Sequence, residues 1–273
     1  MPGTIQSDGR NESPFQRRLQ AIRCIDGISV LPILNLFGSE RQFGGKREIA
    51  SEAIARNRIM VLIDGWACRY RLLPDGRRQI IMLLLPGDVC NPDVLACSNT
   101  SYTVMSLTPC TVIEADAAEL RSLMLSSSKI AQAWMNLIFA DTAMLAERNA
   151  CLGRRSAREH LAHFLCELFI RLRRVGWANS DNFVMRATQE EIADTLGLTA
   201  VHVNRVLMVL RAEGLVSVHG HCVTILDWAR LRVRAGFESR YLHIDGAGSA
   251  ARDHANAFKA GEALLSHSQP CLN

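Results

Sequence analysis

The sequence of residues 188–226 is TQEEIADTLGLTAVHVNRVLMVLRAEGLVSVHGHCVTIL, and it contains the clearest structural signals in the chain. Thr188 is a candidate helix N-cap, and Glu191 completes a capping box three residues later. Gly197 is expected to end this first helix, because glycine adopts a positive φ at little cost. Thr199 then caps a second helix. The spacing therefore predicts two capped helices joined by a glycine turn.

The predicted second helix has one apolar and one polar face. Apolar residues recur at i, i+3, i+4 and i+7, which predicts a buried stripe made of Val203, Val206, Leu207 and Leu210. At about 100° per residue the opposite face carries Val201, Arg205, Met208 and Ala212, with His202 and Asn204 beside it. An exposed arginine and amide on the second of two short helices are typical of a helix-turn-helix. The alternative is an αα-hairpin within a helical bundle.

A β-hairpin is predicted directly after the two helices. Alternating β-branched residues stand on both sides of His219-Gly220-His221, and they are Val216, Val218, Val223 and Ile225. A helical bundle has no need for such a hairpin, whereas a winged helix-turn-helix uses one to touch the DNA backbone. The two tip histidines could donate to phosphates, or they could simply be solvated.

Two stretches of the sequence resemble one family. TQEEIADTLGLTAVHVNRVLMVLRAEGLV resembles the DNA-binding end of the Crp/Fnr family of bacterial transcription regulators, and LIDGWACRYRLLPDGRRQIIMLLLPGD, upstream, resembles that family's β-roll sensor domain. The likeness covers roughly residues 20–232, and the LTxxxVNR run and the PGD turn form a specific combination. It implies a homodimer that recognises a palindromic site in double-stranded DNA through residues 199–213, with RNA polymerase as a further candidate partner.

The whole chain is predicted to have an α+β fold: an N-terminal antiparallel β-roll of the cyclic-nucleotide-binding type, a long dimerisation helix and a C-terminal winged helix-turn-helix. Roughly six to eight short strands are expected in the roll, including a hairpin about Pro74-Asp75-Gly76. Phe15–Leu36 supplies one or two short helices, and Arg41–Ser51 and Val175–Asn182 are predicted to be loops. The predicted boundaries are a disordered tail at 1–14, the β-roll at 15–116, the dimerisation helix at 117–152, the DNA-binding domain at 154–232 and a flexible tail at 245–273.

The charge of the chain is concentrated near the predicted helix-turn-helix. The 273 residues carry a formal net charge of +4. Residues 154–240 hold 13 Arg and no Lys against 9 Asp and Glu, while the rest of the chain balances at 18 against 18. The whole excess, 13 − 9 = +4, therefore falls where phosphate binding would need it.

Composition also limits the compartment. Nine cysteines without a CxxC pair, an odd number, favour reduced thiols in a cytoplasm. No apolar run approaches the roughly 20 residues of a membrane span, so no membrane association is expected. The N-terminus has no apolar segment of a signal peptide.

The predicted dimerisation helix carries two apolar rows with a seven-residue repeat. One row contains Ile130, Leu137, Met144 and Cys151, with Trp134 and Asp141 four positions behind, and the other contains Ile138, Leu145 and Leu152. One row can face a partner helix while the other packs on the roll. We assign dimerisation to Ile130, Trp134, Leu137, Asp141 and Met144. The alternative is a helix wholly buried within its own subunit.

The resemblance also suggests how DNA would be contacted. Arg205 matches the family's base-contacting arginine, which would bind guanine O6 and N7. Val201 stands where many members have Glu, so it would make only apolar contact, for instance with a thymine methyl. The remaining candidates contact phosphate or a second base, and they are Thr188, Gln189, Thr199, His202 and Asn204.

The effector is not evident from the sequence. Cyclic-nucleotide-binding members of the family hold the phosphate with Gly-Glu and Arg residues after the PGD turn. Here the segment after Asp88, VCNPDVLACSNTSYTV, has no Gly, Glu or Arg, and Thr100-Ser101 stands where the Arg is expected. A buried phosphate would lack a counter-charge, so cAMP binding is not expected.

Metal, redox and catalytic chemistry have little support in the sequence. Only Cys24 precedes Cys68, so an N-terminal iron–sulfur cluster is not expected, and His is absent from residues 1–159. Cys90, Cys97 and Cys110 are clustered, as core residues or as a redox group. No nucleophile arrangement indicates an enzyme. The competing function is a ligand- or redox-responsive binding or scaffold protein that keeps the fold without specific DNA recognition.

Overall fold

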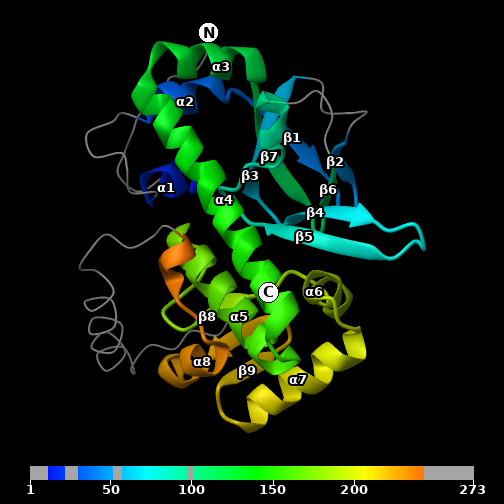
Figure 1. Cartoon of the computed structure of the whole chain (residues 1–273). Helices are drawn as coiled ribbons and strands as arrows, with labels where there is room; N and C mark the ends of the chain where they lie inside the picture. The colour runs from blue at the N-terminus through cyan, green and yellow to red at the C-terminus, as the bar shows by residue number, and fades with distance from the viewer. Residues whose placement is uncertain (1–11, 22–29, 52–56, 97–100, 243–273) are drawn as a thin grey trace.

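The computed structural model describes residues 12–21, 30–51, 57–96 and 101–242. Figure 1 shows a β-rich N-terminal part, a helical C-terminal part and one long helix that runs alongside both. The predicted α+β architecture is confirmed. Residues 1–11 and 243–273, where tails are predicted, lie outside the described residues, and so does the part of the predicted Phe15–Leu36 helices at residues 22–29.

The N-terminal part consists of two antiparallel sheets. One sheet has the strand order β1 (Ser39–Phe43), β7 (Cys110–Asp116), β3 (Arg58–Asp64). The other has the order β2 (Glu48–Ala50), β6 (Thr103–Ser106), β4 (Ala67–Leu72), β5 (Arg78–Leu84). A short 3-10 helix, η1 (Pro92–Leu95), follows the PGD turn. Two sheets of short strands are what the predicted roll requires.

Two features of the roll differ from the sequence-based expectation. The loop predicted at Arg41–Ser51 is wrong, because β1 and β2 occupy most of it. Both are edge strands, and the mostly exposed polar side chains of β1 hide the alternation that marks a half-buried strand. The apolar residues before the predicted hairpin also form two strands, β3 and β4, which belong to different sheets. Gly65 lies between them, and its φ of +80° lets the chain pass from one sheet to the other. The hairpin itself is confirmed, since β4 pairs with β5.

Five helices cover the roll and lead away from it. They are α1 (Pro14–Ala21), α2 (Leu31–Leu36), α3 (Ala117–Ser126), α4 (Ser128–Arg154) and α5 (Ala157–Arg174). The single helix predicted over 117–152 is therefore two helices. Ser127 separates them, and its hydroxyl accepts from the Ile130 amide to cap α4. Ser156 caps α5 with a complete capping box, close to the boundary predicted between the dimerisation helix and the DNA-binding domain.

The C-terminal part has the expected helix-turn-helix and hairpin. Its elements are α6 (Gln189–Leu196), α7 (Ala200–Ala212), β9 (Val216–His219), β10 (Cys222–Ile225), α8 (Trp228–Ala235) and the short η2 (Ser239–Leu242). A third strand, β8 (Asn182–Val184), pairs with the other edge of β10. Its first residue belongs to the loop predicted at Val175–Asn182, and its pairing depends on β10, about 40 residues further on, which local pattern does not reveal.

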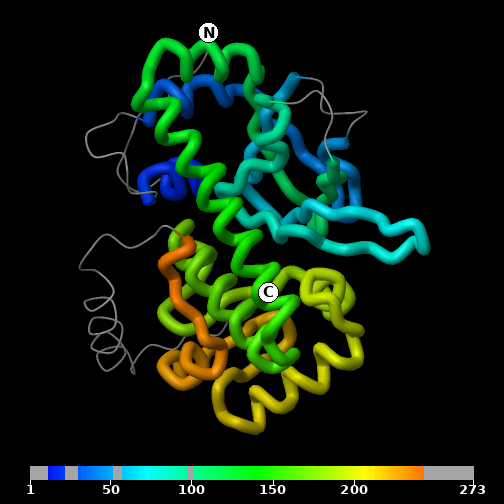
Figure 2. Tube along the Cα trace, in the orientation of Figure 1, coloured from blue at the N-terminus to red at the C-terminus, as the bar shows by residue number. Residues whose placement is uncertain are grey.

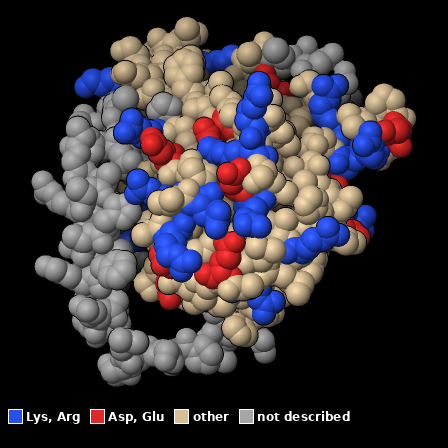
Figure 3. Space-filling view, turned by 60° about the horizontal axis from the view of Figure 1, so that its bottom comes forward, with Lys and Arg blue, Asp and Glu red and all other residues tan. Residues whose placement is uncertain are grey.

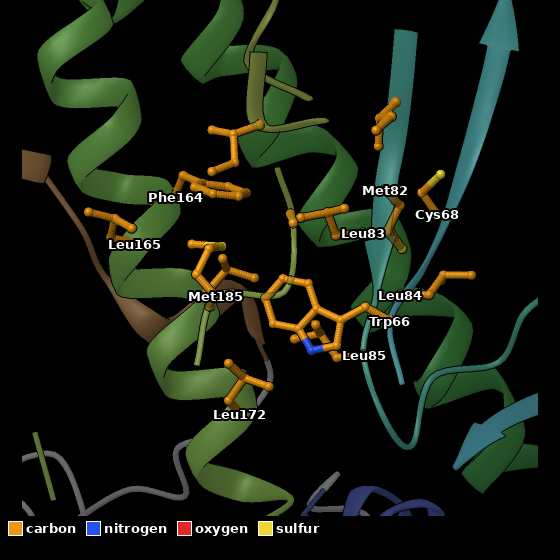
Figure 4. Packing of buried hydrophobic residues seen from close by; sticks show 14 of the residues in the cluster. Trp66, Cys68, Met82, Leu83, Leu84, Leu85, Phe164, Leu165, Leu172 and Met185 are labelled. Atoms are coloured by element: carbon orange, nitrogen blue, oxygen red, sulfur yellow. The ribbon is translucent and has the colours of Figure 1, made fainter. Parts of the chain in front are cut away.

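The largest apolar cluster is continuous from the roll into the DNA-binding part. Figure 4 shows the Trp66 indole between Leu85 of the roll and Met185, with Phe164, Leu165 and Leu172 of α5 nearby. Trp66 is completely buried. A smaller cluster joins α1, α2 and α4 to the outer side of the roll around Phe15, Leu19, Trp134 and Leu137. Figure 2 shows the trace of α4 passing from this cluster down to the helix-turn-helix.

No single helix in the part of the chain that the structure describes is long and apolar enough to cross a membrane. Only α6 and α7 taken together meet that test, and they are bent by 96° with respect to each other. The angle lies within the range of about 90–120° that helix-turn-helix pairs adopt.

Candidate nucleic-acid interface

Local hydrogen bonds fix the helix-turn-helix as the sequence predicts. The Glu191 amide donates to the Thr188 hydroxyl at 3.2 Å, and the Thr188 amide donates to the Glu191 carboxylate at 2.8 Å. Gly197 ends α6 with φ of 66°. The His202 amide donates to the Thr199 hydroxyl at 3.2 Å and begins α7. Each cap satisfies an amide that would otherwise lack a partner. Removal of such a cap typically lowers the free energy of unfolding by about 0.5–2 kcal/mol.

The second helix presents its polar face to solvent. Val203, Val206 and Leu210 are buried, and Leu207 is half-buried. The opposite face is open, with Val201 71% and Met208 61% exposed. His202, Asn204 and Arg205 are exposed beside them. A side chain on this face can therefore enter a groove without any rearrangement of the core.

The structure brings the start of α6 next to α7. The Asn204 side-chain amide donates to the Gln189 side-chain oxygen at 3.3 Å. Thr188 and Thr199 are also exposed, although their hydroxyls already accept from helix amides. All seven predicted DNA-contacting residues thus lie at the surface of one helix pair.

The wing adds further donors to this surface. His219 and His221 are exposed at the hairpin tip on either side of Gly220, whose φ is +57°. The Met185 amide donates to the His221 carbonyl at 2.8 Å, so the segment that enters α6 is tied to the wing. Sequence reasoning missed Arg186, which is exposed and stacks over the Trp177 ring at 4.9 Å. Its place two residues before the Thr188 cap is the signal that could have made it a further candidate for phosphate contact.

Basic side chains extend over the face that includes this end of the molecule. In Figure 3, where the bottom of Figure 1 comes forward, Lys and Arg side chains are spread widely with acidic ones between them. The Arg excess of residues 154–240 lies in the same part of the chain.

The first helix of the pair is also held by the roll. Arg78 forms an ion pair with Asp194 of α6 at 2.6 Å, and the side-chain amide of Gln79 donates to the backbone carbonyl of Asp194 at 2.7 Å. Lys46 forms an ion pair with Glu191, which is almost completely buried. The β4–β5 hairpin therefore contacts the DNA-binding part directly.

The interior of the roll contains an arginine that the sequence analysis did not consider. Arg69 of β4 donates to the Val89 and Cys90 carbonyls at 2.6 and 3.0 Å and to Asp141 of α4 at 3.0 Å. Its guanidinium also lies 5.4 Å from the centre of the Tyr102 ring. This cation comes from β4, which precedes Asp88, and not from the segment after Asp88 where the family resemblance implies an arginine.

Asp141 and Asp88 extend this contact into a buried charge network. Arg18 of α1 forms ion pairs with both carboxylates, and Arg171 of α5 donates to Asp88 at 2.6 Å. Burial alone would raise the pKa of the Asp141 carboxyl, but Arg69 and Arg18 outweigh it and hold the pKa below its ordinary value of 3.8. The roll, α1, α4 and α5 are therefore joined through ionised groups.

The cysteines of the roll are core residues in their geometry. Cys90 and Cys110 are buried, and Cys97 lies outside the described residues. Burial raises the pKa of the Cys90 thiol to about 12 and that of Cys110 to about 11. Because the thiolate is the reactive form, both are poor nucleophiles near neutral pH.

The residues assigned to dimerisation are buried by their own chain. Ile130, Trp134, Leu137, Asp141 and Met144 are buried in the single chain, so little of their surface is free to contact a second copy. The apolar residues of α4 that remain available lie on the other side, and they are Met135, Phe139, Leu145 and Leu152. The row that stays exposed in the single chain is therefore the second one, which contains Leu145 and Leu152.

These elements define a class of protein: a β-roll domain joined by a long helix to a winged helix-turn-helix. Residues 159–234 match the Crp-like helix-turn-helix domain family, and residues 40–127 match the cyclic nucleotide-binding domain family. The chain belongs to the Crp/Fnr family of transcription regulators.

Relatives along most of the chain agree with this assignment. The transcriptional activatory protein AadR of Rhodopseudomonas palustris is 31% identical over 188 residues, 68% of this chain and 77% of the relative. The transcriptional activator protein FnrL of Cereibacter sphaeroides is 28% identical over 233 residues, 84% and 92% of the two chains. The structure of FixK2 from Bradyrhizobium japonicum superposes with a TM-score of 0.61 at 23% identity, covering 77% of this chain and 98% of that one. These relatives are transcription regulators and not enzymes. This protein is likewise a DNA-binding transcription regulator.

Proposed function

We propose that this DNA-binding regulator recognises a palindromic site as a homodimer, with α7 in the major groove and Arg205 as its main base-contacting residue. The observation that carries the proposal is the exposed face of α7, while the opposite face of the helix is buried. The exposed face includes Val201, His202, Asn204 and Arg205. A bidentate arginine–guanine contact contributes about 1–3 kcal/mol of discrimination. The proposed site of action is the bacterial cytoplasm, and RNA polymerase stays a prediction from the family resemblance.

The exposed row of α4 supports the homodimer. Taken as heptads, a positions are Met135, Thr142 and Asn149, and d positions are Ile138, Leu145 and Leu152. All six are exposed or half-buried in the single chain. An apolar d row with a polar a position is a pattern that favours a defined register and two strands.

The proposed regulator does not take a cyclic nucleotide in its roll. Arg69, a buried cation inside the roll, is already bonded to two carbonyls and to Asp141. It links the roll to α4 through the protein's own side chains. Calorimetry with cAMP and cGMP should show no binding, and micromolar affinity for either would contradict this part of the proposal.

Selection from random DNA tests the assignment of α7. The wild-type protein should return a palindrome, and Arg205→Ala should lose the preference at one base pair of each half-site, about 1–3 kcal/mol. Gln189→Ala, at the start of α6, should instead weaken binding to all sequences alike, because phosphate contacts carry no sequence information. An unchanged motif from Arg205→Ala would exclude α7 as the recognition helix.

Mobility shifts at several salt concentrations separate this function from a scaffold role. A regulator that contacts phosphates loses affinity steeply as salt rises but keeps its preference for the selected palindrome. A scaffold protein with the same fold would bind selected and scrambled fragments equally.

A further inference from the structure

Three chemically distinct side chains meet where α4 ends and α5 begins. Glu147 and Cys151 lie one turn apart on α4, and His163 of α5 faces them. One oxygen, one sulfur and one nitrogen of these residues all lie within 4.8 Å of one another. None of the three belongs to the proposed DNA contacts or to the buried charge network of the roll.

The imidazole of His163 is placed as a ligand would be. His163 is only 3% exposed, and its Nε2 lies 3.3 Å from a Glu147 oxygen. That nitrogen nevertheless makes no hydrogen bond of acceptable geometry with any described residue. Tyr241 stacks on the ring at 5.7 Å, and Phe237 meets its edge at 5.1 Å, so the ring orientation is fixed. A buried imidazole nitrogen without a hydrogen-bond partner is a group that a bound metal ion would satisfy.

We propose that Glu147, Cys151 and His163 bind a divalent transition-metal ion of the Zn²⁺ type through one oxygen, one sulfur and one nitrogen. This ligand set suits zinc and its neighbours and does not suit magnesium or calcium, which prefer oxygen alone. Bonds of about 2.0–2.3 Å in tetrahedral geometry place ligand atoms about 3.3–3.8 Å apart. The nitrogen and oxygen already have this separation, and a water completes the fourth position.

Arg155 occupies the ligand atoms in the metal-free protein. Its guanidinium donates to the Cys151 sulfur at 2.8 Å and to the Glu147 carboxylate at 2.7 Å. Burial raises the pKa of the Cys151 thiol to about 11, so the bound ion must displace both Arg155 and the thiol proton, which passes to solvent. Arg155 is partly exposed and can turn outward. Of the other charged groups nearby, Arg148 opposes a cation and Glu167 favours one.

Displacement of Arg155 would change a contact between two parts of the molecule. The same guanidinium donates to the Gly236 carbonyl at 3.1 Å, at the residue that ends α8. The ion would therefore replace a link from α4 to α8 by a link from α4 to α5. This places the proposed site at the junction through which α4 holds the DNA-binding part.

Titration of the full-length protein with Co²⁺, followed by displacement with Zn²⁺, tests the site. One ion per chain should give a thiolate-to-cobalt charge-transfer band together with the intense ligand-field bands of tetrahedral cobalt. Cys151→Ser should abolish the charge-transfer band. His163→Gln should weaken affinity by more than about 100-fold, which exceeds the loss typical when a residue that only orients a ligand is changed. Cys222→Ser, in the wing, is the matched cysteine control and should leave spectrum and affinity unchanged.

Two milder substitutions keep the proposal testable if the buried variants fail to fold. Glu147→Gln should weaken Co²⁺ binding, whereas Arg155→Ala should strengthen it by about tenfold or more, because the competing cation is gone. Circular dichroism checks that each variant is folded. A cobalt spectrum without a thiolate band, or equal affinity in all four variants and the wild type, would overturn the proposal.

Discussion

Asp141 is the residue on which the contact between the roll and α4 depends most directly. It accepts from Arg69 of the roll and from Arg18 of α1, and it is buried. A buried ion pair adds little compared with well-packed apolar groups, but removing one partner leaves an unpaired charge. The sequence placed Asp141 in a dimer seam because its partner lies 72 residues away along the chain. No local pattern contains that information.

Replacing Asp141 with Asn should destabilise the protein by about 3–5 kcal/mol near neutral pH. Because the folded pKa of Asp141 lies below its ordinary value of 3.8, the carboxylate contributes stability above that pH and loses it as the pH falls through the folded pKa. Urea unfolding of the variant and the wild type should therefore converge in strong acid. Asp75→Asn should have a much smaller effect, because the ion pair of Asp75 with Arg77 is open to solvent. A constant difference between Asp141→Asn and wild type at every pH would contradict this role.

Among the elements, those with strong local signals could be predicted from the sequence. The caps at Thr188 and Thr199 and the glycine at Gly197 identify α6 and α7 because each signal acts within a few residues. Strands β1, β2 and β8 could not be found in this way, since their pairing partners lie far along the chain. The seven candidate DNA contacts lie on these two helices or at their caps. Helix periodicity therefore suffices to predict that they are exposed.

The long helix α4 shows where periodicity reaches its limit. Two heptad rows were visible in the sequence, but the repeat alone does not say which row packs on the roll. The structure decides this through burial, with Leu137 inside and Leu145 36% exposed. One face of a helix cannot pack on the roll and on a partner helix at the same time, so the two contacts need two different apolar rows.

Replacing Leu145 with Glu should convert the dimer to a folded monomer. The substitution places two like charges in the proposed interface, which costs several kcal/mol of association free energy. Analytical ultracentrifugation measures the outcome, and circular dichroism confirms the fold. Leu137→Glu should instead unfold the chain, because Leu137 is buried within it. Leu125→Glu on α3, where the side chain is 89% exposed, should stay dimeric. A folded, dimeric Leu145→Glu variant would show that the exposed row of α4 is not the seam.

In the whole molecule, the roll and the DNA-binding part share one core and several polar contacts. Trp66, Arg78 and Arg171 each join residues from both parts. Such continuity means that a change in the roll alters the contacts of α5 and α6 without passing through a flexible linker. If the roll senses a signal, these contacts are the part of the structure through which we expect it to reach the helix-turn-helix.

Trp66→Ala should weaken this connection specifically. Deleting a fully buried indole costs about 3–5 kcal/mol of unfolding free energy, since both the apolar contacts and the filled volume are lost. Hydrogen exchange, measured at fixed protein concentration, should rise in α5 and α6 as well as in the roll. Trp134→Ala is the matched control, because that indole is equally buried but lies in the cluster between the roll and α4. It should destabilise the protein while raising exchange mainly in α1, α2 and α4. Equal protection patterns in the two variants would mean that the shared core does not couple the roll to the helix-turn-helix.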